Sequence, residues 1–336
     1  MIKMSNKNSE ERIPRNFLLL QVILIILGII GFIFSIWIDV IYIEIDIIQI
    51  IFNVITYLGD TLVFIVVVAV IYIVYDKRFA KNLTLALLTT VYINSFLKDV
   101  FIDPRPIQNE LRATGYGFPS GHSQGAATFW GYIGYEFKDD LRDNIVPILF
   151  SILLLLVALS RIIIAVHDLQ DISGGLIFGV LVLLAFIYLE PIATEKLNSY
   201  TLQIRIIIGV LLSLALFLFG TLLFPTSGQQ LLEEKAIPFA DVGSYAVVGG
   251  VLLGLTIGYE LENQYVHYEP SRLQVKYKIL NLVIGLIIVF VLYFGLEFLT
   301  DIFNSVIYRF IRYALIAFIL VFIVPWIFTK INPKEE

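Results

Sequence analysis

Two of the three histidines in the chain stand in short polar segments between strongly apolar ones. His122 ends the segment PSGH, and His167 precedes Asp171 by four residues. In a helix this spacing places His167 and Asp171 on one face. A carboxylate there can fix the imidazole tautomer and leave the other ring nitrogen free to attack an electrophile. His122 is then available to protonate a leaving oxygen.

Three cations accompany the histidines. Lys98 and Arg105 form the pattern Lys-x6-Arg-Pro, and Arg161 lies six residues before the second histidine. Such cations supply charge and N–H donors to an anion whose oxygens redistribute charge during transfer. Ser120 and Gly121 stand where a helix is expected to begin, so backbone N–H groups and the helix dipole would favour the same anion. Together these residues indicate a phosphate site.

Each of these residues also has a structural interpretation when taken alone. Lys98 and Arg105 could be interfacial anchors, and Arg161 could extend its charge from the end of a span to the interface. His167 and Asp171 could be a structural hydrogen-bonded pair. The three patterns in this order favour chemistry. No second carboxylate lies near enough in the sequence to predict a two-metal site, and the chain has no cysteine, so we expect neither a metal nor a cofactor.

The elements that must position these residues are membrane helices. The chain has 336 residues, 59% of them hydrophobic and 15% charged, whereas soluble domains carry about 25% charged residues. A membrane span needs roughly 20 apolar residues. The sequence therefore predicts an all-α integral membrane protein with about ten transmembrane helices, near residues 16–38, 60–75, 79–97, 121–137, 145–165, 172–190, 204–224, 242–260, 279–299 and 307–328. The second and fourth are the weakest of these predictions.

A polar stripe occupies the segment between the first two predicted spans. Its members recur at steps of three and four residues, which is helical periodicity; they are Asp46, Gln49, Asn53, Thr56 and Asp60. One interpretation is a helix that lies in the membrane interface. The other is an overlong start to the second span.

Lysine and arginine predict the orientation of the chain. With both termini in the cytoplasm and ten alternating spans, the inner segments hold sixteen of the 23 Lys and Arg residues, and the outer segments hold seven. Cytoplasmic loops carry an excess of these residues. We therefore expect a multi-pass protein of the cell membrane with cytoplasmic N- and C-termini. The three segments that carry the candidate residues, near residues 98–106, 119–122 and 160–171, then all lie at the outer face.

The three motifs resemble those of the type 2 phosphatidic acid phosphatase superfamily, which is related to vanadium haloperoxidases. The resemblance covers about residues 16–190 and implies a six-helix core and a metal-independent phosphatase acting through a phosphohistidine. It implies that His167 is the nucleophile, that Asp171 orients it, and that His122 serves as acid and then as base. It also implies a set of residues that hold the phosphate, namely Lys98, Arg105, Ser120, Gly121 and Arg161.

Two units are expected on this basis. Residues 1–200 would form the phosphatase core, and residues 201–336 a four-span extension of unknown role that carries no catalytic pattern. Gly250, Gly254 and Gly258 in the extension form a ridge of small residues that lets helices approach closely, which indicates packing.

Three functions remain open at this point. The leading hypothesis is a membrane phosphatase that hydrolyses lipid phosphates or diphosphates, such as phosphatidic acid, phosphatidylglycerophosphate or, with a slight preference, polyprenyl diphosphate. A lipid phosphotransferase could use the same phosphohistidine with another acceptor than water. A lipid transporter or scaffold is the third hypothesis. The expected partner is a membrane lipid phosphate; the net charge of −5 argues against a nucleic acid, and the sequence does not give the oligomeric state.

Overall fold

The protein is built of helices, with one pair of two-residue strands in the part of the chain that the structure describes. The computed structural model describes residues 13–38, 45–106, 115–139, 145–224, 231–232, 235–236, 243–299, 302–303 and 305–332. The α-helices are α1 (Arg15–Phe34), α2 (Asp46–Thr56), α3 (Thr61–Val70), α4 (Lys77–Phe101), α5 (Gly121–Glu136), α6 (Ile145–Ile163), α7 (Leu169–Asn198), α8 (Leu202–Leu223), α9 (Gly243–Tyr265), α10 (Val275–Phe298), α11 (Val306–Phe318) and α12 (Val324–Ile331).

Shorter elements connect or extend these helices. A 3-10 turn, η1 (Tyr57–Gly59), follows α2, and a π-helical turn, η2 (Ile71–Tyr75), extends α3. A second π-helical turn, η5 (Ile319–Ile323), joins α11 to α12, and the 3-10 turn η4 (Pro270–Arg272) precedes α10. The strands β1 (Leu231–Leu232) and β2 (Lys235–Ala236) pair antiparallel between α8 and α9.

Seven helices of the described residues are long and apolar enough to cross a membrane: α1, α6, α7, α8, α9, α10 and the continuous run from Val306 to Ile331. The segments Asp46–Gly59 and Thr61–Tyr75 pass the same test only as a pair, and they are bent by 54° at their junction. Helices occupy all ten ranges expected from the sequence, but α4 and α5 do not meet this test. The multi-span, all-α class is thus confirmed, and the count of ten stays a prediction.

Burial explains why α5 is less apolar than a lipid-facing span. Every residue from Ser123 to Gly134 is buried, so this helix lies inside the bundle. Its polar side chains are paired there with polar groups of α4: Gln124 donates to the carbonyl of Thr90 at 3.1 Å, and the hydroxyls of Thr128 and Thr90 lie 3.0 Å apart. A buried polar group costs little free energy when it is hydrogen-bonded.

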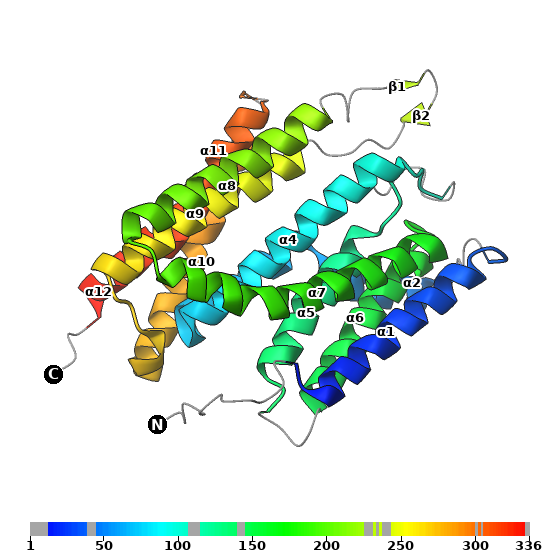
Figure 1. Cartoon of the computed structure of the whole chain (residues 1–336), viewed down its shortest axis with the longest axis horizontal. Coiled ribbons are helices and arrows are strands. Elements are labelled where there is room, and N and C mark those ends of the chain that lie inside the picture. Colours follow the sequence, from blue (N-terminus) through cyan, green and yellow to red (C-terminus); the bar gives the residue numbers. More distant parts are fainter. Residues whose placement is uncertain are drawn as a thin grey trace.

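Figure 1 shows α4 running between two groups of helices. On one side lie α1, α2, α5, α6 and α7, and on the other lie α8, α9 and α11. Helix α4 contacts α5 and α7 of the first group and α9 of the second. The chain therefore returns to one central helix from both halves of its sequence.

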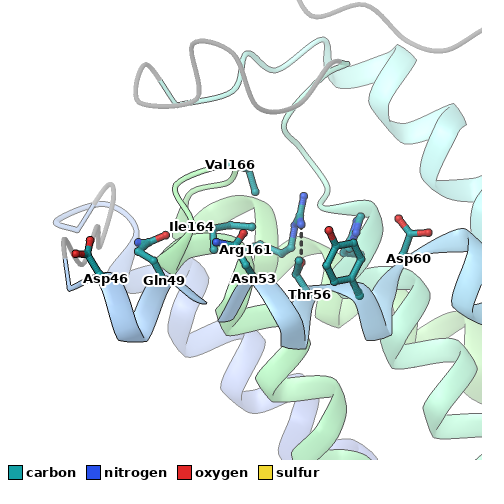
Figure 2. A pocket seen from close by; sticks show the side chains of 10 residues that line it. Asp46, Gln49, Asn53, Thr56, Asp60, Arg161, Ile164 and Val166 are labelled. Carbon is teal, nitrogen blue, oxygen red and sulfur yellow. Dashed lines mark hydrogen bonds between the residues drawn. The ribbon is translucent and has the colours of Figure 1, made fainter. Parts of the chain in front are cut away.

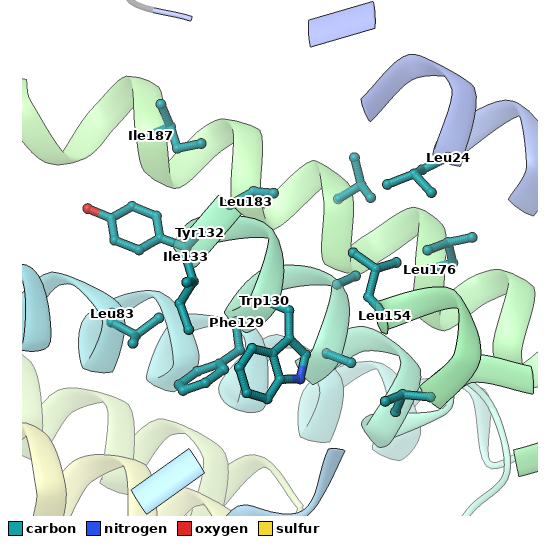
Figure 3. Close-up of a cluster of buried hydrophobic side chains, with 14 of the residues drawn as sticks. Leu24, Leu83, Phe129, Trp130, Tyr132, Ile133, Leu154, Leu176, Leu183 and Ile187 are labelled. Carbon is teal, nitrogen blue, oxygen red and sulfur yellow. The ribbon is translucent and has the colours of Figure 1, made fainter. Parts of the chain in front are cut away.

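The largest apolar cluster surrounds α5. Phe129 and Trp130 of α5 pack with Leu154 of α6 and Leu183 of α7 (Figure 3). Phe64 of α3 belongs to the same cluster, and all five side chains are buried. The Trp130 indole donates to the carbonyl of Leu58 at 2.9 Å. Because the hydrogen bond of Trp130 ties η1 to α5, the end of α2 is fixed relative to α5.

The glycine ridge of α9 packs as the sequence predicts. A β-carbon added at Gly250 would lie 2.3 Å from the carbonyl oxygen of Phe310, and one at Gly254 would lie 2.1 Å from that of Ala314. Only glycine permits this approach of α9 to α11. The packing role expected for the ridge is confirmed.

Helix α2 does not continue straight into α3. The chain turns at Asp60, whose carboxylate caps α3 by accepting from the backbone N–H of Leu62 at 2.8 Å. Apolar side chains of α2 are exposed on the outside of the molecule, with Ile47, Ile50 and Val54 each 65% exposed. The segment is therefore bent at Asp60, and it passes the test for a membrane span only together with α3. Both interpretations, an interfacial helix and an overlong start to the second span, stay predictions.

Candidate active site

His167 lies in the turn between α6 and α7. Helix α6 ends at Ile163, and Ala165 then adopts a left-handed conformation with φ 58° that reverses the chain. The backbone N–H of His167 consequently donates back to the carbonyl of Arg161 at 3.2 Å. Asp171 is in the first turn of α7, and its Oδ2 lies 2.6 Å from Nδ1 of His167. Both side chains are almost wholly buried, so this contact fixes the imidazole ring.

The other ring nitrogen of His167 faces a cation. Nη1 of Arg105 lies 2.9 Å from His167 Nε2 and also donates to the carbonyl of Val166 at 2.9 Å. Burial, followed by the positive charges of Arg105, Lys98 and Arg161, holds the pKa of His167 well below its ordinary value of 6.5. The imidazole is therefore neutral at physiological pH and keeps a lone pair on Nε2.

Lys98 and Arg105 are held by one short loop. The ammonium of Lys98 donates to the carbonyls of Tyr116 and Gly117, the latter at 3.1 Å. Nε of Arg105 donates to the carbonyl of Gly115 at 2.9 Å. Burial lowers the pKa of Arg105 to about 10, which leaves its guanidinium charged at neutral pH. The loop therefore directs both cations toward the buried histidine.

The start of α5 brings the PSGH segment beside α7. The backbone N–H of Ser120 donates to the carbonyl of Asp171 at 2.9 Å, and the Ser120 side chain caps α5 by accepting from the backbone N–H of Ser123. Asn94 of α4 donates to the carbonyl of Pro119 at 3.0 Å. A β-carbon at Gly121 would lie 3.1 Å from the Asn94 amide oxygen, so a larger residue would be crowded there. The N-terminal end of α5 is thereby fixed against the His167 turn.

Arg161 and His122 line one cavity of about 640 Å³ together with α2. Arg161 is 7% exposed, and its Nη1 donates to the hydroxyl of Thr56 at 2.6 Å. Figure 2 shows the stripe of α2 from Asp46 through Gln49 and Asn53 to Thr56 along one side of this cavity. The cavity provides an open approach to the otherwise buried site.

All eight residues expected at the site lie in this region, although they do not all contact one another. His167, Asp171 and Arg105 are in direct contact. His122 and Arg161 share the cavity, and Lys98 is near enough to affect the charge state of His167. Ser120 and Gly121 form the helix start that Asn94 and Asp171 hold in place.

Sequence reasoning did not assign the stripe of α2 or Asn94 to the site. The stripe was visible as a periodic pattern, but periodicity does not tell which element a helix faces. Asn94 was one polar residue inside an expected span, which is the signal that could have drawn attention to it. Within the described residues, no group of three or more His, Cys, Asp or Glu side chains is placed to hold a metal ion.

The fold and this geometry define a class of protein: a polytopic helical membrane protein with a buried histidine amid cations suited to phosphate. Comparison with known families gives the particular family. The model described as PAP2 superfamily matches residues 79–195, and that described as PAP2 superfamily phosphatase, transmembrane extension, matches residues 245–336. The chain belongs to the PAP2 superfamily. All eight candidate residues fall within the first match.

Characterised relatives carry related names. Phosphatidylglycerophosphatase B of Bacillus subtilis (strain 168) is 31% identical over 137 residues, which cover 38% of this chain and 68% of that protein. Sphingosine-1-phosphate phosphatase 1 of Rattus norvegicus is 24% identical, with 82% and 71% coverage. Lipid phosphate phosphatase delta of Arabidopsis thaliana is 25% identical over 58% of this chain, which spans about half (47%) of that relative's length.

Proposed function

We propose that this protein is a membrane phosphatase that hydrolyses lipid phosphates through a phosphohistidine at His167. The observation that carries the proposal is the contact of His167 with two opposite partners. Asp171 fixes Nδ1 at 2.6 Å, and Nε2 is directed to the guanidinium of Arg105 at 2.9 Å. A neutral imidazole held in this way has its nucleophilic nitrogen where cations would bind phosphate oxygens. The names of the relatives support a lipid phosphate as substrate.

The reaction has two steps in this proposal. In the first step the Nε2 lone pair of His167 attacks phosphorus, the bond from phosphorus to the ester oxygen breaks, and His122 donates a proton to that oxygen. In the second step His122 takes a proton from water, the water oxygen attacks phosphorus, and the phosphorus–nitrogen bond breaks. Inorganic phosphate leaves, and both histidines return to their starting forms.

The cations take the part that a metal ion would otherwise play. Lys98, Arg105 and Arg161 would neutralise the non-bridging oxygens, and the N-terminal end of α5 would add backbone donors at Ser120 and Gly121. Turnover should therefore be independent of divalent metals.

The test is phosphate release by purified protein from a panel of lipid phosphates, with and without EDTA. We expect release to persist in EDTA and His167→Ala to be inactive. Asp171→Asn should lower kcat by about a thousandfold or more, because the imidazole of His167 would no longer be held in the tautomer that carries its proton on Nδ1. The matched control is Asp76→Asn, because Asp76 caps α4 at the backbone N–H of Phe79 at 2.7 Å and asparagine caps equally well. Absence of release from every lipid phosphate, or loss in EDTA that magnesium restores, would overturn the proposal.

We further propose that the termini are cytoplasmic and that the site opens on the outer face of the cell membrane. Because the chain has no cysteine, single cysteines can report the orientation. Ile302, which is 65% exposed between α10 and α11, and Ser199, exposed after α7, are expected on opposite faces. A membrane-impermeant maleimide should label Ile302→Cys on intact cells and Ser199→Cys only after lysis. The reverse pattern would show the opposite orientation.

A further inference from the structure

The cavity beside His122 has one wall that the proposed reaction leaves without a role. This wall is the polar stripe of α2, and the lining includes Asp46, Gln49, Asn53, Tyr57 and Asp60. Helical residues rise about 1.5 Å each, so the stripe runs about 15 Å from Thr56 to Asp46. That length suits a polar group that extends several bonds beyond a phosphate.

The wall lies on the leaving-group side of the site. His122 is the proposed proton donor to the ester oxygen, and it lines the cavity, whereas His167 is 1% exposed and is not one of the lining residues. A β-carbon at Gly59 would lie 3.0 Å from Cδ2 of His122, so the junction of α2 and α3 is packed directly against this ring. In the proposed reaction the alcohol that accepts the proton of His122 must therefore leave along α2.

The chemistry of the wall differs from that of the phosphate site. Two carboxylates, Asp46 and Asp60, and the amide of Asn53 line this part of the cavity, and their oxygens accept hydrogen bonds. Carboxylates beside a phosphate site attract hydroxyl or ammonium donors and repel a second phosphate. This side of the site suits neither a polyprenyl alcohol, which has no donor beyond its ester oxygen, nor a diphosphate, whose leaving group is an anion.

We propose that the polar face of α2 is a leaving-group subsite that selects lipid monophosphates whose alcohol carries hydroxyl or ammonium donors near the ester oxygen. The inference rests on the proposed function and names its substrate class. It runs against the preference for polyprenyl diphosphate that the sequence suggested. Asn53 and Asp46 are the residues to test, because Thr56 holds Arg161, Gln49 donates to the carbonyl of Ile163 and Asp60 caps α3.

The experiment compares kcat/KM for three probes in the same mixed micelles: a long-chain amino-alcohol monophosphate, farnesyl monophosphate and farnesyl diphosphate. Wild type should prefer the first. In Asn53→Leu the ratio of the amino-alcohol substrate to farnesyl monophosphate should fall about tenfold, the effect of one lost hydrogen bond to a charged group. In Asp46→Asn the ratio of farnesyl diphosphate to farnesyl monophosphate should rise about threefold, because one repelling charge is gone. Hydrolysis of an aryl phosphate shows that each variant is folded.

Val54→Ala is the matched control. Val54 is next to Asn53 in sequence but 65% exposed and outside the cavity lining, so both ratios should equal those of wild type. If the folded Asn53→Leu and Asp46→Asn variants keep the wild-type ratios, the subsite is wrong while the phosphatase proposal stands. A wild-type preference for farnesyl diphosphate would also overturn it. If wild type hydrolyses none of the probes and no other lipid phosphate, it is the proposed function that fails.

Discussion

At the scale of single residues, the two histidines differ in how they are held. His167 is buried, and both of its ring nitrogens have close neighbours, Asp171 at 2.6 Å and Arg105 at 2.9 Å. His122 lies on the wall of an open cavity at the first turn of α5. The first environment restricts a ring to one orientation, and the second lets a ring meet an arriving substrate and its leaving oxygen. Replacement of His167, the proposed nucleophile, and of His122, the proposed proton donor, should therefore have different effects on activity.

Replacement of His122 should depend on the leaving group. A lipid alkoxide is a poor leaving group and needs a proton, whereas an activated aryl oxide departs with little help. We expect His122→Ala to lose roughly a hundredfold or more in kcat on a lipid monophosphate and to retain measurable turnover on an aryl phosphate. His167→Ala should be inactive on both. Equal losses of His122→Ala on every leaving group would contradict its role as proton donor.

The buried state of His167 should make stability depend on pH. Its pKa in the folded protein is well below 6.5, so below pH 6.5 the unfolded chain binds a proton that the folded chain does not. The contribution of neutral His167 is complete above pH 6.5 and is lost by about 1.4 kcal/mol for each unit that the pH falls, until it reaches the folded pKa. Between pH 7 and 5, the Tm of wild type in detergent should therefore fall more than that of His167→Gln. Parallel curves would show that this histidine does not titrate as inferred.

At the scale of elements, the position of His122 depends on the contact between α5 and α7. A β-carbon at Gly179 would lie 2.6 Å from the carbonyl oxygen of Gln124 and 2.7 Å from the β-carbon of Ala127. Both distances are shorter than van der Waals contact. The atoms involved are a backbone oxygen and a β-carbon, which cannot rotate away, so the two helices would have to separate.

Gly179→Ala should therefore destabilise the protein by about 1–3 kcal/mol and lower its activity, because α5 carries the proton donor. Gly295→Ala in α10 is the matched control, since no atom lies within 4 Å of the added β-carbon. That substitution should leave the Tm unchanged or raise it slightly, because alanine favours a helix over glycine. Thermal unfolding in detergent and phosphate release measure the two effects. Equal stability of the two variants would refute the close-packing argument.

Much of the helical content could be predicted from the sequence, because a run of apolar residues long enough to cross a membrane has few alternatives. The weakest predictions were α3 and α5. Helix α5 meets protein on every side, so polar residues such as Gln124 and Thr128 replace lipid-facing ones. The sequence could not show that their partner is Thr90, because partners across helices leave no periodic signal.

The candidate site divides in the same way. His167 and Asp171 are four residues apart on one turn, so their contact follows from local geometry. The contact of Arg161 with Thr56 joins residues 105 positions apart and depends on the bend at Asp60, which no local pattern specifies. The polar stripe of α2 was therefore visible, but its place beside the site was not.

At the scale of the whole molecule, the second half of the chain contacts the first through α9 and α4. The residues that line the cavity beside the site all precede residue 167. Helix α9 instead contacts α4 through two polar pairs: Lys77 with Glu262 at 2.7 Å near one end, and Tyr245 with Asp99 at 2.6 Å near the other. We propose that residues 201–336 serve to hold α4, and hence Lys98, in place.

The pair of Lys77 and Glu262 tests this proposal. Glu262 is 0% exposed and also accepts from the backbone N–H of Tyr268 at 2.7 Å. Lys77→Met would leave a buried carboxylate without its cation, at a cost of about 3–5 kcal/mol. Adding Glu262→Gln should restore much of the stability, because the amide carries no charge and still accepts from Tyr268. If Lys77→Met alone is as stable as wild type in thermal unfolding, the pair does not hold α4 to α9.

The exposed apolar side of α2 has a consequence for kinetics. Ile47, Ile50 and Val54 face outward while the opposite side lines the cavity, so a helix placed in the interface would open the site sideways into the lipid layer. Such an enzyme meets its substrate in two dimensions and responds to the mole fraction of substrate among the surrounding lipids. Dilution of the substrate with an inert phospholipid, at constant bulk concentration, should slow turnover in proportion. Addition of more vesicles of the same composition, at saturating total lipid, should leave the rate unchanged.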